Sequence, residues 1–425
     1  MKLLIQQGTI VDPEKNIEGI QDILIEDGVI TAVAPKIDAP EAEVLDGRNL
    51  WISPGLVDPH VHLRDPGFTY KEDISTGTAA AAHGGFTAVA CMPNTKPVAD
   101  RPEVIRSILE RAKAGSGTRV YPIGAISTGE QGEACTDFAA LKEAGAVALS
   151  DDGVPVMRAV LMREALQKAK AVGLPLLCHE EDGEMVQNYA VNEGKISRQL
   201  GIPGRPAIAE ELMVVRDGLL SLETGVPVHF CHISTAGSVG IIRRLKEAGA
   251  AVTCETCPQY FTLTEEVILE QGSLARVNPP LRTATDVAAI VEGLRDGTID
   301  CIATDHAPHS AEEKARPLTE APSGMVGLET SLAITLTELY HSGAMALTEI
   351  LQKMTAAPSK VLKLPHGKLA VGKMADLTLF DLNELWTIDP ANFRSKGRNT
   401  PFAGKAVRGK VKYTLVDGRI IYRDE

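Results

Sequence analysis

Residues 55–64 read GLVDPHVHLR, an apolar run that leads into two histidines separated by one residue. Side chains alternate along a β-strand with a period of two, so His60 and His62 project from the same face of a strand. Both imidazoles can therefore reach one ion, and histidine is the commonest metal ligand in proteins. Arg64 follows directly and offers a guanidinium to an anionic substrate. A lone His-x-His pair is weak evidence, so the rest of the chain must supply further ligands.

Strand-like and helix-like segments alternate through the middle of the chain. Eight apolar runs can be recognised: 56–62, 86–92, 119–125, 146–150, 174–179, 226–232, 251–255 and 300–305. Most are separated by segments with a helical pattern, such as 159–172, 210–223 and 238–248. Eight β/α units are what a closed (β/α)8 TIM barrel requires. The alternative is a doubly wound open sheet, but the chain lacks the Gly-x-Gly-x-x-Gly fingerprint expected there.

The two ends of the chain have a different pattern, made of short strand-like runs and tight turns. Asp27-Gly28 near the start and Asp417-Gly418 near the end are both typical of hairpin turns. We therefore expect an α/β protein with two domains. Residues 1–53 and 360–425 are predicted to form a small β-sandwich domain, and residues 54–359 the TIM barrel.

Composition restricts the possible partners and compartments. With 44% hydrophobic and 23% charged residues, the 425-residue chain is typical of a globular protein. A net charge of −13 argues against nucleic acid or an anionic membrane as a partner. We expect neither a signal peptide nor a membrane span. Seven scattered cysteines indicate a reduced, cytoplasmic protein, and the lone Cys254-x-x-Cys257 pair lacks a second pair to complete a four-sulfur site.

Polar residues follow the predicted strands at the points where those strands end. They are His60, His62, Asn94, Asp151, Asp152, His179, His232 and Asp305, with Asn278 in the loop after the seventh run. In a barrel all of these positions map to the C-terminal rim, where active sites are built. His229 lies three residues before His232, so we expect it on the opposite strand face in a structural role.

Four histidines and two carboxylates are more than one catalytic zinc takes. They suit two metals that share a bridging ligand and a bridging hydroxide. A carboxylate can bridge by giving one oxygen to each ion. Either Asp151 or Asp152 could do so, because alternation lets only one of them face the interior and the Asp-Asp-Gly sequence does not decide which. Asp305 could bind one metal and still take a proton from the hydroxide.

A set of segments resembles the bacterial type I dihydroorotases of the amidohydrolase superfamily. The segments are HVHLRDPG at 60–67, MPNT at 92–95, SDDG at 150–153, CHIS at 231–234, NPPLR at 278–282 and ATDHAPH at 303–309. The similarity continues through 324–330 to 399–404. It implies that Asp152 is the bridging ligand. Relatives in the superfamily bridge their metals with a carbamylated lysine, but residues 146–153 contain no lysine, so an aspartate must serve.

The same resemblance implies a role for each remaining site residue. His60, His62 and Asp305 would complete one zinc site, and His179 and His232 the other, giving two zinc ions per chain. The substrate would be contacted by His62, Arg64, Asn94, Asn278, His309 and the backbone of Ser323 and Gly324. Segment 306–324 is expected to be either a lid that closes over the substrate or an ordered surface loop.

The implied activity is the reversible hydrolysis of (S)-dihydroorotate to N-carbamoyl-L-aspartate, in de novo pyrimidine (UMP) biosynthesis. A metal-bridging hydroxide would attack, and Asp305 would act as general acid and base. Arg64 fits the ring carboxylate, which hydantoins lack. The alternatives are another cyclic amidohydrolase, such as an allantoinase or hydantoinase, and a non-catalytic partner of aspartate transcarbamoylase. A homodimer and a complex with aspartate transcarbamoylase are the two assemblies considered.

Overall fold

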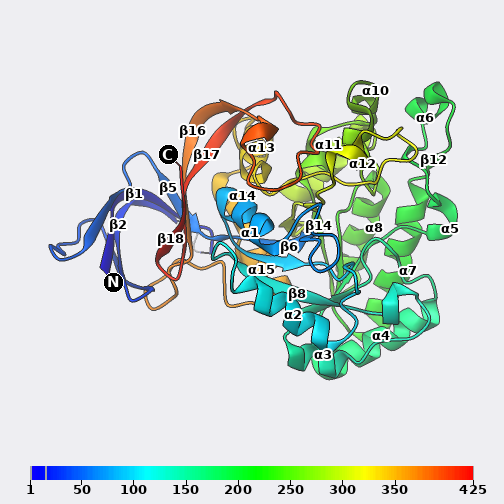
Figure 1. Cartoon of the computed structure of the whole chain (residues 1–425), viewed down its shortest axis with the longest axis horizontal. Helices are drawn as coiled ribbons and strands as arrows, with labels where there is room; N and C mark the ends of the chain where they lie inside the picture. Colours follow the sequence, from blue (N-terminus) through cyan, green and yellow to red (C-terminus); the bar gives the residue numbers. More distant parts are fainter. Residues whose placement is uncertain (1, 15–16, 425) are drawn as a thin grey trace.

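The computed structural model describes residues 2–14 and 17–424. Figure 1 shows two parts: a barrel from the middle of the chain, and a sheet in which the first strands lie beside the last. The chain therefore begins and ends in the same sheet, and the barrel is inserted between.

Within the described residues, eight parallel strands follow one another around the barrel in sequence order. They are β6 (Leu56–Val61), β7 (Phe86–Cys91), β8 (Arg119–Ala125), β9 (Ala148–Ser150), β10 (Leu176–Cys178), β13 (Val228–Phe230), β14 (Val252–Thr256) and β15 (Cys301–Ile302). A parallel bridge between Val61 and His306 connects the last segment to the first, and the His62 N–H donates to the His306 carbonyl at 2.8 Å. The strand order never reverses, as it would in a doubly wound sheet, so the predicted (β/α)8 barrel is confirmed.

Helices cover the outside of the barrel. They are α1 (Ile74–His83), α2 (Pro102–Ala112), α3 (Phe138–Ala144), α4 (Ala159–Val172), α7 (Ile208–Thr224), α8 (Ala236–Glu247), α11 (Ala284–Arg295), α14 (Leu347–Met354) and α15 (Ala356–Val361). Short helices and one small strand pair lie in the connections: α5 (Gly183–Val186), α6 (Lys195–Leu200), α9 (Pro258–Thr262), α10 (Ile268–Gln271), α12 (Ala311–Lys314), α13 (Ser331–Thr335), β11 (Val191–Asn192) and β12 (Gly204–Arg205).

Apolar patterning explains both layers of the barrel. Every residue of β6 and of β7 is buried, because a parallel strand in a barrel is covered on both faces. In α4, the buried residues Leu161, Met162, Ala165, Leu166 and Ala169 recur at helical spacing and face the sheet. The helix ends at Gly173, whose φ of +74° lies in the left-handed region that glycine adopts without steric cost.

Several strands are shorter than the apolar runs that predict them. β10, β13 and β15 end at Cys178, Phe230 and Ile302, so His179, His232 and Asp305 lie just beyond them. His232 has a φ of +35° and Asp305 a φ of +48°. These left-handed conformations interrupt the strand ladder, and such strain is characteristic of functional sites.

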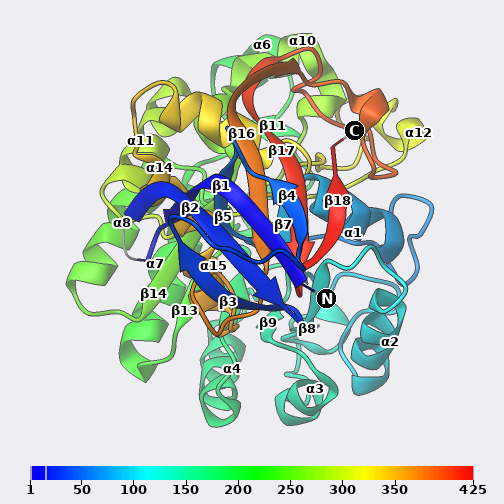
Figure 2. The ribbon, with the colours of Figure 1, turned by 90° about the vertical axis from the view of Figure 1, so that its left-hand side faces the viewer.

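Strands from both termini form one continuous sheet (Figure 2). They are β1 (Lys2–Asp12), β2 (Ile17–Glu26), β3 (Val29–Ala34), β4 (Glu43–Asp46), β5 (Trp51–Pro54), β16 (Leu377–Thr387), β17 (Ala406–Val416) and β18 (Arg419–Arg423). An antiparallel ladder from Trp51–Phe380 to Pro54–Leu377 joins β5 to β16. Ile5, Ile23 and Ile52 pack in one apolar core with Leu377 and Leu379, so the predicted β-sandwich from both termini is confirmed. Only Gly55 separates β5 from β6.

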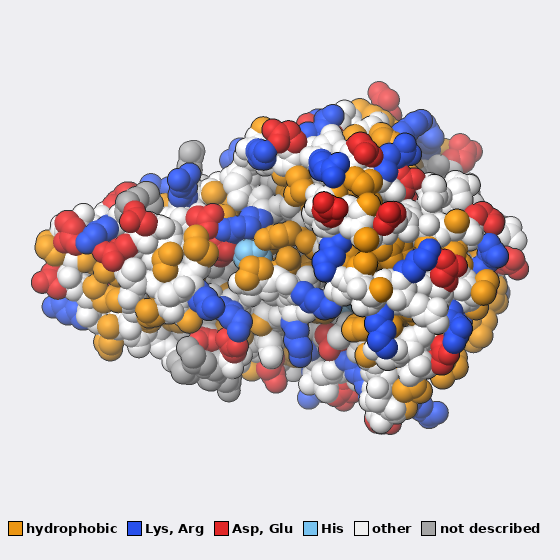
Figure 3. Space-filling model, turned by 90° about the horizontal axis from the view of Figure 1, so that it is seen from below, with side chains coloured by type: hydrophobic (Ala, Val, Ile, Leu, Met, Phe, Trp, Pro, Cys, Tyr) orange, Lys and Arg blue, Asp and Glu red, His pale blue; other side chains and the backbone are white. Residues whose placement is uncertain are grey.

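The surface is mixed in charge. Figure 3 shows Lys and Arg side chains interspersed with Asp and Glu across the visible face of both parts, without a large area of one sign. Among the residues that the structure describes, no helix has the length and apolar character needed to cross a membrane.

Candidate metal centre and substrate pocket

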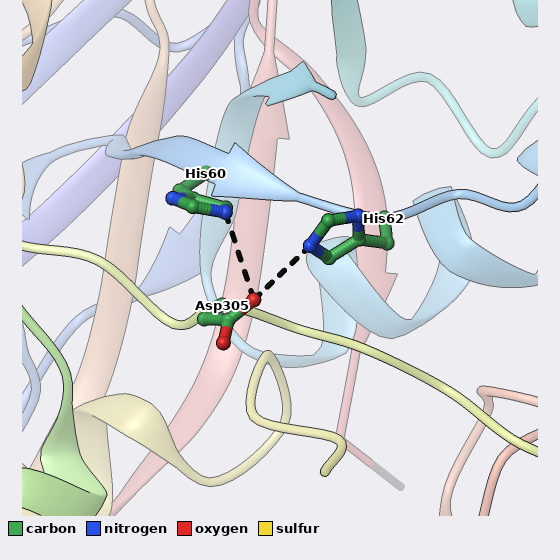
Figure 4. Close-up of side chains that lie close together, drawn as sticks. All are labelled: His60, His62 and Asp305. Carbon is green, nitrogen blue, oxygen red and sulfur yellow. Dashed lines mark hydrogen bonds and ion pairs between the residues drawn. The ribbon is translucent and has the colours of Figure 1, made fainter. Parts of the chain in front are cut away.

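Three side chains meet where β6 ends. His60 lies within β6, His62 directly follows it, and Asp305 follows β15 next to them in the barrel. Figure 4 shows both imidazoles directed at one oxygen of Asp305. His62 Nε2 lies 3.1 Å, and His60 Nε2 3.6 Å, from Asp305 Oδ1. The predicted His-x-His pair therefore converges with a carboxylate from the last barrel strand.

Asp152 lies at the centre of the histidines. Its Oδ1 is 3.4 Å from His60 Nε2, 3.7 Å from His179 Nδ1 and 3.5 Å from His232 Nε2. Its Oδ2 is 3.4 Å from His62 Nε2. The two oxygens of one carboxylate thus face different histidines, which is the arrangement of a ligand shared between two ions.

Asp151 points elsewhere. Its carboxylate accepts hydrogen bonds from the Ser127 N–H at 3.0 Å and from the Ser127 hydroxyl. Burial raises the pKa of Asp151 to about 6. The structure therefore brings Asp152, and not Asp151, among the histidines.

Unpartnered polar atoms support a cation at this place. His60 Nε2 and Asp152 Oδ1 are buried, face each other and have no hydrogen-bond partner in the described part of the chain. Buried polar atoms are rarely left in this condition. Two buried groups, one of His60, His62 and Asp305 and one of His60, Asp152 and His232, each bring their ligand atoms within 4.8 Å of one another. Imidazole nitrogens and carboxylate oxygens form a donor set that fits zinc.

The charge of this centre favours the same conclusion. Burial opposes ionisation of Asp152, but the charge of His60 and the close polar contacts of the surrounding histidines outweigh it and hold the pKa of Asp152 well below its usual range. The centre therefore keeps an anion at a buried position on the wall of the cavity. A cation would neutralise that anion.

Three of the four histidines donate a hydrogen bond from the ring nitrogen that faces away from the centre. His60 Nδ1 donates to Glu255 Oε1 at 2.8 Å, His62 Nδ1 to Asn94 Oδ1 at 2.9 Å, and His179 Nε2 to Glu181 Oε2 at 3.0 Å. Each such bond fixes which ring nitrogen carries the proton and leaves the other nitrogen's lone pair facing the centre. Asn94 therefore orients the His62 ring as well as lining the pocket.

Sequence reasoning missed Glu255 and Glu181. Glu255 ends the seventh apolar run, for which no ligand was proposed at the strand end, and Glu181 lies two residues after His179. Both positions could have been predicted, because histidines that bind metals commonly donate their other ring N–H to a carboxylate. Burial would raise the pKa of Glu255, but hydrogen bonds from His229 and His60 outweigh it and hold that pKa at about 2.

The prediction that His229 faces away from the site was wrong. His229 Nε2 lies 3.0 Å from Glu255 Oε2, on the inside of the barrel. The argument from strand alternation fails because β13 ends at Phe230 and the backbone at His232 is left-handed. The side chains of His229 and His232 therefore both point into the barrel, with His229 nearer the amino ends of the strands.

A cavity of about 170 Å³ opens beside the centre. Its lining includes all the residues that were predicted to contact the substrate: His62, Arg64, Asn94, Asn278, His309, Ser323 and Gly324. Asn278 Oδ1 is buried and unpartnered among the described residues, so it is available to accept from a ligand N–H. Arg64 adopts a left-handed φ of +58° and its Nε donates to the Pro308 carbonyl at 3.3 Å.

Segment 306–324 is folded over this cavity. His309 is only 5% exposed and donates from Nε2 to the Ser323 carbonyl at 2.8 Å, while its Nδ1 accepts from Lys71 at 3.2 Å. Burial, followed by the nearby charges of Arg64 and Lys71, lowers the pKa of His309 far below its usual value, so its imidazole is neutral. The segment lies against the pocket and brings a neutral hydrogen-bonding group into it.

The Gly324 position is tightly enclosed. A Cβ there would lie 2.7 Å from Ala307 Cβ and 3.1 Å from His309 Nε2, and its φ is +133°. The Gly324 N–H already donates to the Arg276 carbonyl at 2.9 Å. A substrate that binds the Gly324 N–H or the Ser323 carbonyl must therefore replace the contact with Arg276 or with His309.

Two family models match the chain. The model described as Dihydro-orotase-like matches residues 49–238, and the one described as Amidohydrolase family matches residues 225–422. A dihydroorotase from Acetivibrio thermocellus is 48% identical and one from Pelotomaculum thermopropionicum is 50% identical, each over 100% of this chain and 99% of the relative.

Solved structures share the architecture. The L-hydantoinase (dihydropyrimidinase) from Arthrobacter aurescens superposes with a TM-score of 0.89 at 26% identity, covering 99% of this chain and 96% of that one. The dihydropyrimidinase from Brevibacillus agri superposes with a TM-score of 0.88 at 25% identity, covering 100% and 95%.

Proposed function

The chain belongs to the dihydroorotase family of the amidohydrolase superfamily, and from this premise we propose that it catalyses the reversible hydrolysis of (S)-dihydroorotate to N-carbamoyl-L-aspartate. The product is a precursor in de novo pyrimidine synthesis. The observation that carries the proposal is that an arginine and a histidine–aspartate centre line the same small cavity.

Recognition of the substrate carboxylate is assigned to Arg64. A guanidinium offers two parallel N–H donors that match a carboxylate. Arg64 is half-buried on the wall of the pocket, where such a contact is partly shielded from water. Hydantoin and dihydrouracil have no carboxylate, so this residue distinguishes dihydroorotate from them.

The ring itself meets neutral groups. Asn278 Oδ1 is placed to accept from a ring N–H, and neutral His309 can donate to a ring carbonyl after exchanging its contact with Ser323. Neither interaction requires a change in protonation.

Two zinc ions are proposed as the cofactor. His60, His62 and Asp305 would hold one, His179 and His232 the other, and Asp152 would join them with one oxygen each. When bound, such a pair polarises a carbonyl and lowers the pKa of water towards neutrality. The aspartate bridge carries the negative charge that a carbamylated lysine supplies in other members of the superfamily.

Asp305 is assigned the proton transfer. Its Oδ1 contacts both histidines of the first site, and its residue lies at the wall of the cavity. In hydrolysis it accepts a proton from the attacking water, and it delivers that proton to the ring nitrogen as the amide bond to the carbonyl carbon breaks. In ring closure the same steps run in reverse.

The location of the enzyme is proposed from its cysteines. All seven are unpaired, which favours the reducing cytoplasm. A homodimer and a complex with aspartate transcarbamoylase are the two assemblies to be compared.

Substrate preference and metal content, measured on the same preparation, test the proposal. The zinc-loaded protein is assayed with dihydroorotate, dihydrouracil and hydantoin, and its bound metal is counted. We expect dihydroorotate to be turned over with the highest kcat/KM, at about two zinc ions per chain. Faster turnover of either carboxylate-free ring would favour the hydantoinase alternative. Full loss of metal without loss of function would favour a non-catalytic role.

A further inference from the structure

A hydrogen-bonded chain crosses the barrel interior from the metal centre toward the opposite mouth. His60 Nδ1 donates to Glu255 Oε1 at 2.8 Å, and the other oxygen of Glu255 accepts from His229 Nε2 at 3.0 Å. His229 Nδ1 in turn accepts from the Thr253 hydroxyl at 2.8 Å. His60, Glu255 and His229 are each at most 1% exposed.

The direction of each bond is determined by the groups themselves. Each oxygen of the Glu255 carboxyl faces one imidazole nitrogen, and a carboxylate oxygen accepts, so His60 and His229 both donate to it. The other ring nitrogen of His229, Nδ1, faces the Thr253 hydroxyl, which can donate to it. The orientation of Thr253 is therefore coupled through three bonds to the lone pair that His60 presents to the metal centre.

The strands place these residues in register. His229 on β13 pairs directly with Thr253 on β14, and Glu255 lies two residues further along β14 on the same face. The series of hydrogen bonds thus runs along one face of the sheet, from the amino end of the barrel toward its carboxyl end. From Glu255 it crosses the barrel interior to His60.

The His229 and Thr253 end of this hydrogen-bonded series borders a second cavity. This cavity has a volume of about 760 Å³ and lies at the amino ends of the strands, where its lining includes Pro175, Pro227, His229, Thr253 and Asp300. His229 therefore lies in the wall of a cavity at the mouth opposite the substrate pocket.

We propose that Glu255 and His229 are positioning residues for the metal centre, acting on it only through His60. Glu255 keeps the His60 proton on Nδ1, and His229 keeps Glu255 at hydrogen-bond distance from His60. Loss of either lets the His60 ring reorient or change tautomer, and a proton on Nε2 blocks coordination. The inference rests on the proposed metal site but not on the identity of the substrate.

The test measures the zinc dissociation constant by competition with a chelator, on folded protein without substrate. We expect His229→Ala and Glu255→Gln to weaken zinc binding about 10- to 100-fold. This is the typical effect of removing a group that hydrogen-bonds to a metal-binding residue. His229→Gln keeps an N–H donor toward Glu255, so its affinity should stay within about threefold of wild type. Urea unfolding of the metal-free proteins, measured in parallel, separates a loss of stability from a loss of metal affinity.

A matched control comes from another histidine–glutamate pair. His83 Nδ1 contacts Glu329 Oε2 on the outside of the barrel and reaches no metal-binding histidine. His83→Ala should leave the zinc dissociation constant unchanged, whatever it does to stability.

Rescue from solution gives a second readout. Removal of the His229 side chain leaves space that connects with the second cavity, so free imidazole should restore zinc affinity to His229→Ala but not to Glu255→Gln. Wild-type protein at the same imidazole concentration gives the baseline for direct competition between imidazole and the protein for zinc. Unchanged zinc affinity in folded His229→Ala and Glu255→Gln would overturn the inference, whereas absence of zinc binding by wild type would instead overturn the proposed metal centre. If His229→Ala does not fold, Glu255→Gln and His229→Gln still decide between the outcomes.

Discussion

Asp151 and Asp152 are neighbours in the chain, yet their carboxylates face opposite surroundings. Asp152 lies within 3.7 Å of three histidine nitrogens through one oxygen, whereas Asp151 accepts from the backbone and hydroxyl of Ser127. The two residues therefore form a built-in pair of test and control positions, with the same residue type and similar burial.

Replacement of Asp152 should dismantle the metal centre. We expect Asp152→Ala to lose at least one zinc ion per chain and nearly all activity, because it removes the carboxylate whose two oxygens face both sides of the centre. Asp151→Ala should retain its zinc, although loss of the Ser127 contacts lowers stability. Metal analysis of both variants checks this, and equal zinc content in wild type and Asp152→Ala would refute the bridge.

Arg64 should affect the choice of substrate and not the metal. Arg64→Met keeps the length of the side chain but removes the two donors. We expect normal zinc content and a decrease in kcat/KM for dihydroorotate of about 30- to 1,000-fold, corresponding to about 2–4 kcal/mol for a charge-assisted bidentate contact. Steady-state kinetics with metal analysis test this. A variant with wild-type kinetics would show that the carboxylate is bound elsewhere.

Asp305 should be needed for catalysis beyond its role as a ligand. Asp305→Asn keeps one ligand oxygen and the volume of the side chain but cannot carry a proton. We expect partial retention of zinc and loss of both ring hydrolysis and ring closure by at least about 100-fold. Rates in both directions are measured at a zinc concentration that saturates the variant. An active, zinc-saturated Asn variant would mean that the proton takes another route.

Lys314 gives the loop over the pocket a dependence on pH. Its Nζ donates to the carbonyls of Pro322 and Gly324, both at 3.0 Å, and burial together with the charge of Arg276 lowers the pKa of Lys314 to about 7. Between pH 7 and about 10 the unfolded chain then binds more protons than the folded one, so this residue's contribution to the free energy of unfolding increases with pH.

Urea unfolding at pH 7.5 and pH 9.0 measures this effect. We expect wild type to gain about 2 kcal/mol over that interval relative to Lys314→Met, from one proton at about 1.4 kcal/mol per pH unit. Lys363 is exposed and also donates to a backbone carbonyl, that of Gly173, so Lys363→Met serves as the control and should follow the wild-type curve. Parallel curves for wild type and Lys314→Met would contradict the prediction.

The sequence was sufficient to predict the barrel because its signals are local. Eight apolar runs separated by helical patterns require little tertiary information, and polar residues at the run ends map to one rim by the geometry of the fold. Helix α4 was predicted to its exact end residues because an amphipathic pattern ends at a glycine. The confirmed pairing of the two termini followed from their shared pattern of short strands and turns.

Details that depend on contacts between distant strands were not predictable. The choice between Asp151 and Asp152 depends on Ser127, which lies on a neighbouring strand connection. His229 and His232 both face inward because the backbone leaves the strand after Phe230 and is left-handed at His232, and no propensity scale reports that. The role of Glu255 follows from its hydrogen bond with His60, which is 195 positions away in the sequence.

The ladder between β5 and β16 has a consequence for how the protein is made. Synthesis on the ribosome releases β5 and the strand that carries His60 long before Leu377–Phe380, with which β5 must pair, exists. For most of translation the edge of β5 that will face β16 is therefore unpaired and exposes backbone hydrogen-bonding groups and apolar side chains. Unpaired strand edges of this kind promote misfolding and aggregation of nascent chains. Chaperone binding to the nascent chain should last until about the final fifty residues emerge, because only then can β5, which leads directly into the strand that carries His60, pair with β16.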